Sequence, residues 1–124
     1  MRVRKKPSVA TLATALRLRR AGRRREALAV LREVARERPK DAMVWFYFAV
    51  TLDNLGRERE AIPRYHRALR LDARHPRAME IALYLASSYR KTGRPAAARR
   101  WLAEAETRGA NSALQRRLRR LLDV

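Results

Sequence analysis

Apolar residues recur along the chain at helical spacing, in segments that short polar turns separate. Glycine or proline marks most of these turns, as Gly22, Pro39, Gly56, Pro76 and Gly93 do. A glycine favours the positive φ that commonly ends a helix, and a proline interrupts helical pairing. The pattern predicts six helices, near 8–21, 25–38, 42–55, 59–72, 77–92 and 95–108.

The segments also repeat one another. Three glycines lie 34 and 37 residues apart, an alanine follows each of them after five residues, and a large side chain follows each alanine after four. The landmarks are Gly22, Gly56 and Gly93, then Ala27, Ala61 and Ala98, then Leu31, Tyr65 and Leu102. Three landmarks that recur together indicate an internal repeat of helical hairpins.

This arrangement resembles the tetratricopeptide repeat, in particular that of small bacterial proteins with three repeats. The middle unit matches best, and the resemblance covers about residues 8–112. Its first helix contributes Trp45, Phe48, Ala49 and Leu52, and the third unit has Ala82, Leu85, Ala86 and Tyr89 at the same positions. The proline expected at the end of a unit is present as Pro39, whereas Ala73 stands there in the next unit.

A seventh helix is predicted after the third unit. Ser112 and Gln115 form a capping box, and leucines then follow on one face of the segment. The predicted fold is all-α, a right-handed α-solenoid of three helix-turn-helix repeats with a C-terminal capping helix. The predicted parts are a basic N-terminal tail (1–7), three repeats (8–41, 42–78 and 79–112) and the capping helix (113–124).

Two prolines complicate this scheme. Pro63 falls inside the fourth predicted helix, where it lacks a donor and crowds the preceding turn. A late start of that helix near Glu60 is favoured over a kink. Three extra residues, Pro76 to Ala78, are expected to lengthen the start of the fifth helix.

The first helix of each unit lines the inner, concave face of such a stack. The positions beside the core residues there are apolar or aromatic, which fits an amphipathic helix or a hydrophobic peptide. The candidate groove residues are Val9, Leu12, Leu16, Met43, Phe46, Tyr47, Val50, Leu83, Tyr84 and Ser87.

One subset of the family binds the terminal carboxylate of its partner with a clamp of lysine, arginine and asparagine side chains. That clamp is absent, because other residue types stand at the positions that it would need, namely Leu12, Leu16, Tyr47, Glu80 and Tyr84. The resemblance therefore implies a protein or peptide partner of another kind. Two alternatives stay open, since the groove side chains could be buried within the monomer or covered by a second copy in a homo-oligomer.

Charge supplies a second candidate surface. The chain has 31 Lys and Arg against 12 Asp and Glu, a formal net charge of +19, with the excess toward both ends. Such a field steers an acidic partner, and it equally allows contact with RNA or a ribosome. A GC-rich genome would also encode many arginines whatever the function. The candidate basic patch contains Arg19, Arg20, Arg23, Arg24, Arg25, Arg116, Arg117, Arg119 and Arg120.

Catalysis has little support in the sequence. There is no cysteine, no glycine-rich phosphate loop, and no third ligand near His66 and His75, which are expected on the solvated surface. Trp101 is expected to pack against the capping helix. We therefore predict a cytoplasmic protein that is not an enzyme and has no cofactor, metal site or membrane span.

Overall fold

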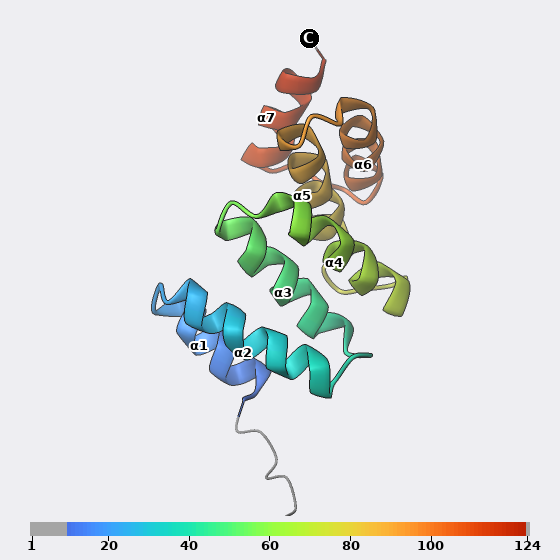
Figure 1. Cartoon of the computed structure of the whole chain (residues 1–124). Coiled ribbons are helices and arrows are strands. Elements are labelled where there is room, and N and C mark those ends of the chain that lie inside the picture. The colour runs from blue at the N-terminus through green and yellow to red at the C-terminus, as the bar shows by residue number, and fades with distance from the viewer. Residues whose placement is uncertain (1–9, 124) are drawn as a thin grey trace, which may run out of the picture.

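Seven α-helices make up the part of the chain that the computed structural model describes, residues 10–123. They are α1 (Leu12–Arg20), α2 (Arg24–Glu37), α3 (Ala42–Asn54), α4 (Glu58–Leu71), α5 (Ala78–Lys91), α6 (Pro95–Thr107) and α7 (Ala113–Leu122). Three helical hairpins stack along the chain, and α7 closes the C-terminal end (Figure 1). The predicted fold class is confirmed. The predicted tail at residues 1–7 lies outside the described residues.

Small and large side chains alternate in the core between the hairpins. Ala15, Ala49 and Ala86 on the first helices are fully buried, and their size lets the paired helix of the hairpin approach closely. Tyr65 and Leu102 on the second helices are also fully buried. One cluster of buried residues runs from α1 to α7, so the repeats share a continuous core.

The first helix begins later than predicted. Thr11 has extended backbone angles, and its side chain accepts a hydrogen bond from the Thr14 amide at 3.1 Å. This is an N-cap, so the helix begins at Leu12 rather than near residue 8.

The predicted late start of the fourth helix is wrong. α4 begins at Glu58 and carries Pro63 in its second turn. Ala61 and Ile62 are buried in helical register before the proline, and the Ala61 amide donates to the Arg57 carbonyl at 3.1 Å. Burial of these two side chains therefore holds the first turn in place although Pro63 has no amide to donate.

The three extra residues before the third unit, Pro76 to Ala78, go mainly into a loop. α5 begins at Ala78, so only this residue lengthens the helix, whereas the connection 72–77 is longer than the equivalent connection 38–41. His75 fixes the loop, because its Nε2 donates to the Ala42 carbonyl (3.1 Å) and its Nδ1 accepts from the Arg77 amide (2.9 Å). The expectation of a solvated His75 is wrong, since only 3% of it is exposed.

Candidate functional site

The first helices α1, α3 and α5 carry the residues expected to line the inner face. Six of these side chains are partly exposed, and we call them the inner strip: Leu12, Leu16, Met43, Tyr47, Val50 and Tyr84. All three hairpins contribute to the strip, because each supplies its first helix. The strip therefore consists of partly exposed apolar and aromatic side chains from all three repeats.

Three other candidates of the groove are buried instead. Phe46, Leu83 and Ser87 are 3%, 5% and 9% exposed. The Phe46 ring packs against His75 at 5.7 Å between centroids, and the Arg77 guanidinium lies over it at 5.9 Å. These three side chains are therefore buried within the monomer, which is one of the two alternatives that the sequence left open. Val9 lies outside the described residues.

Arginine borders the strip at its α1 end. Arg19 reaches from α1 to α3, where its Nη1 donates to Thr51 Oγ1 at 2.7 Å and to Asn54 Oδ1 at 3.2 Å. A shallow pocket of about 290 Å³ lies beside it, lined by Leu16, Arg19, Arg20 and Tyr47. Arg19 therefore serves the inner face rather than a basic patch on the outside.

A half-buried carboxylate, that of Asp53, connects α3 with α4 and α5. Its Oδ2 accepts hydrogen bonds from the Tyr65 hydroxyl (2.9 Å) and the Ser88 hydroxyl (3.4 Å). Burial raises the pKa of Asp53 above its ordinary value, while these two donors and the nearby Lys91 oppose the rise. The sequence pattern gave Asp53 no role. Its position twelve residues before Tyr65, at the end of a helix, gave no signal of this network.

The predicted basic patch divides into two clusters at opposite ends of the solenoid (Figure 1). Near α2, Arg24 and Arg25 are exposed, and Arg23 forms an ion pair with Glu26 at 2.5 Å. On α7 the exposed members are Arg116, Arg117 and Arg120. The patch is thus not one continuous surface.

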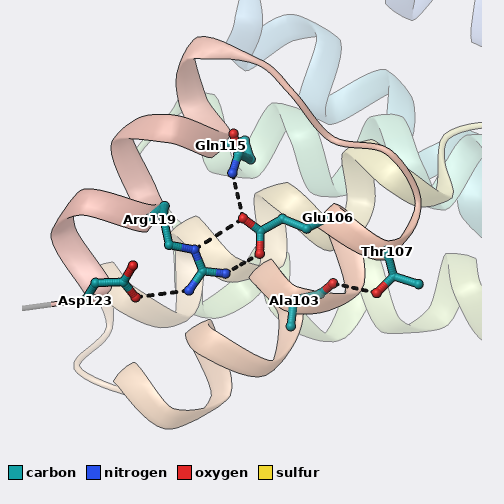
Figure 2. Close-up of polar contacts among 6 residues, drawn as sticks. All are labelled: Ala103, Glu106, Thr107, Gln115, Arg119 and Asp123. Carbon is teal, nitrogen blue, oxygen red and sulfur yellow. Dashed lines mark hydrogen bonds and ion pairs between the residues drawn. The ribbon is translucent and has the colours of Figure 1, made fainter.

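Arg119, another member of the patch, attaches α7 to α6. Its guanidinium donates to both carboxylate oxygens of Glu106 and, through Nη1, to Asp123 at 3.0 Å (Figure 2). Gln115 donates to the same Glu106 at 2.6 Å. Arg119, which the sequence suggested as an exposed positive charge, is therefore paired within the fold.

Acid is expected to weaken this attachment of α7. The hydrogen bond from Arg119 is the main cause that holds the pKa of Glu106 below its ordinary 4.5. A carboxyl group whose pKa is lowered by folding stabilises the fold above its ordinary pKa and loses this contribution as the pH falls through the lowered value. Urea unfolding at pH 6 and pH 3 should show a larger loss of stability for the wild type than for Glu106→Gln. An equal loss of stability in the wild type and in Glu106→Gln would contradict a stabilising role of the Glu106–Arg119 pair.

Both histidines make hydrogen bonds within the fold. Among residues 10–123, no group of three or more His, Cys, Asp or Glu side chains is placed to hold a metal ion. His66 is half-buried rather than solvated as expected, and its Nε2 lies 2.7 Å from the Tyr89 hydroxyl. Burial is the main cause that lowers the pKa of His66, with contributions from Arg70 and Arg94.

Trp101 packs edge-on against His66 of α4, with ring centroids 5.3 Å apart. It lines a hollow between α4 and α6. None of the described helices is both long and apolar enough to span a bilayer.

Known families and structures agree with this architecture. The family model described as Tetratrico peptide repeat matches residues 42–122, and a second one, described as Tetratricopeptide repeat, matches residues 12–62. Comparison with curated proteins gives no match.

Several solved structures share the fold. The type III secretion translocator chaperone SycD of Yersinia enterocolitica superimposes with a TM-score of 0.76 at 19% identity, over 95% of this chain and 85% of that one. PcrH in complex with the chaperone binding region of PopD gives 0.73 at 17% identity, over 90% and 84%. A mutant of MamA gives 0.72 at 30% identity, over 85% and 76%.

The stacked hairpins define a helical-repeat fold of the class of protein-interaction modules. The chain belongs to the tetratricopeptide repeat family.

Proposed function

We propose that this protein is a non-catalytic cytoplasmic scaffold that binds a partner peptide or helix along the inner strip. The observation that carries the proposal is the partial exposure of apolar side chains on α1, α3 and α5 at once. A single exposed leucine or tyrosine needs no explanation, but a strip across three repeats is the kind of surface that a partner covers. An amphipathic helix or an extended peptide with apolar anchors would bury it.

The charges around the strip favour a partner with acidic flanks. Arg20 is exposed at the α1 end and shares the shallow pocket with Leu16 and Tyr47. Lys91 is exposed at the end of α5, 3.9 Å from Glu58. With a net charge of +19, the protein attracts acidic segments over a distance, which raises the association rate more than the final affinity.

Two of the structural relatives were solved with peptides bound. SycD was crystallised with a peptide of the translocator YopD, and PcrH with the chaperone binding region of PopD. Their low identity to this chain makes them evidence for the fold, and the strip itself supports the transfer of peptide binding to this protein.

A matched pair of leucine variants tests the proposal. Leu16→Asp places a charge on the strip, whereas Leu121→Asp makes the same change on the exposed side of α7. The wild type and both variants are immobilised and exposed to cell lysate with nuclease and high salt, and the retained protein is identified and its affinity measured. We expect Leu16→Asp to bind about tenfold more weakly or worse, and Leu121→Asp to bind like the wild type. Equal binding by all three proteins would refute the proposal.

The same experiment separates the alternatives. Nucleic acid or ribosomal material that is released by nuclease or salt, and is lost on charge reversal at Arg24 and Arg25, would favour RNA or ribosome contact. A particle size that grows with protein concentration and falls in Tyr47→Glu would favour a homo-oligomer covering the strip. In both cases Leu16→Asp would not show the selective loss of one protein partner.

A further inference from the structure

The junction between the first and second repeats and the junction between the second and third repeats are filled by different side chains. At the junction of α2 and α4, the Trp45 ring stacks on Phe48 with centroids 5.7 Å apart. Its Nε1 donates to the Pro39 carbonyl at 2.8 Å, and the Arg67 guanidinium covers its other side at 4.6 Å. A large side chain of the protein itself thus closes this junction.

One repeat later the same positions carry other residues. Counting from the repeated glycines and alanines, Ala82 stands where Trp45 stood and Leu85 where Phe48 stood. In the second helix, Trp101 and Glu104 replace the arginines that cover the rings, Arg64 and Arg67. No indole is therefore available from α5 to close the junction of α4 and α6.

A hollow of about 450 Å³ is present at this junction, within the size range of ligand pockets. Its lining comes from two second helices and the turns that follow them. α4 and its following turn contribute residues 69 and 73, and α6 and its following turn contribute the others (Figure 1 shows the two helices). The lining residues are Leu69, Ala73, Arg100, Trp101, Glu104 and Arg108. Apolar walls thus meet a rim with two arginines and one glutamate.

The polar groups of the hollow leave donors free. Arg108 Nε is taken by Glu104 at 2.9 Å, so the only carboxylate of the lining is already paired. Arg100 is exposed and has no ion-pair partner among residues 10–123. The Trp101 indole is partly exposed, and its N–H has no hydrogen-bond acceptor within the described chain. The free groups are therefore a cation and a neutral donor, which suit an acceptor that carries negative charge.

We propose that this hollow is a second docking site, which takes a large apolar side chain from an acidic segment of another protein. The apolar anchor is inferred from the equivalent junction, where the Trp45 indole contacts Pro39 and Arg67, because their counterparts by repeat register, Ala73 and Glu104, line the hollow here. The acidic flanks are inferred from the free Arg100 and the overall charge of +19. Because the hollow lies on the second helices and the inner strip on the first, the two sites would allow two partners to be held together.

The two tryptophans allow a direct test by NMR, because the Trp45 indole N–H is bonded inside the protein and serves as an internal control. The probes are a blocked hexapeptide with a Leu-Phe pair between two pairs of glutamates and the same peptide with lysines. We expect the acidic peptide to shift the Trp101 indole signal in a saturable way and the basic peptide to leave it unchanged. Trp45 should not move with either peptide.

Charge reversal on the rim gives the matched control. Arg100→Glu should raise the apparent Kd of the acidic peptide about fivefold, and Arg36→Glu, the same change at an exposed site on α2, should not change it. Absence of a Trp101 shift, or equal shifts with both peptides, would overturn the proposal. A Trp101 signal that changes with protein concentration alone would also overturn it, since a second copy would then occupy the hollow.

Discussion

Replacing Tyr65 by alanine is expected to lower the free energy of unfolding by about 3–5 kcal/mol, a large part of the stability of a small domain. Tyr65 is 0% exposed and lies on α4 at the centre of the solenoid, where it contacts the Tyr84 ring with centroids 6.1 Å apart. Its removal leaves a cavity between the second and third hairpins and deprives Asp53 of its nearer hydroxyl donor. Urea unfolding followed by circular dichroism measures the loss.

Tyr65→Phe isolates the contribution of the hydroxyl. We expect it to cost about 1–2 kcal/mol near neutral pH, because the half-buried carboxylate of Asp53 is left with one donor fewer. Folding raises the pKa of Asp53, so this group favours the folded state at low pH and that contribution is lost as the pH rises through the raised value. The deficit of Tyr65→Phe should therefore be smaller at pH 4 than at pH 7. A deficit that does not change with pH would show that Asp53 is not the partner that matters.

Truncation of Leu118 is expected to detach the capping helix. This residue is 1% exposed on α7, and Leu118→Ala should lower the free energy of unfolding by about 2–5 kcal/mol. Leu121 is 43% exposed on the same helix, so Leu121→Ala should stay within about 0.5 kcal/mol of the wild type. The two variants remove the same atoms from the same helix, which makes the comparison a measure of burial alone.

The measurement for this pair is urea unfolding together with hydrogen exchange of the amides in α6. Loss of α7 should expose the adjoining part of α6, because Arg99 Nε donates to the Leu122 carbonyl at 2.9 Å and Glu106 pairs with Arg119. Faster exchange in Leu118→Ala and unchanged exchange in Leu121→Ala are the expected results. Similar effects of both substitutions would mean that α7 is not held by its buried leucines.

The repeat architecture was accessible from the sequence because its signals are local. Gly22, Gly56 and Gly93 each end a first helix at a φ between 75° and 78°, a region that glycine favours over residues with a side chain. The alanine five residues later is fully buried in every hairpin, as the recurrence of Ala27, Ala61 and Ala98 implied. Backbone conformation and spacing act within a few residues, so single-sequence patterns report them well.

The exposure of the groove side chains was decided by neighbouring hairpins. The sequence placed Phe46 and Tyr47 together on the inner face, yet Phe46 is covered by the loop that carries His75 and Arg77, and Tyr47 remains partly open. Nothing in the local pattern around residue 46 reports a loop that lies about thirty residues away.

Some charged residues are held within the fold in the same way. Arg19 and Arg119 looked like members of exposed clusters, but each reaches another helix that supplies its acceptors. Periodicity tells which face of its own helix a residue occupies, whereas burial and pairing depend on what the rest of the chain places against that face. The sequence alone therefore determined the repeated helices of this protein, and only the tertiary packing decided which of their side chains remain available to a partner.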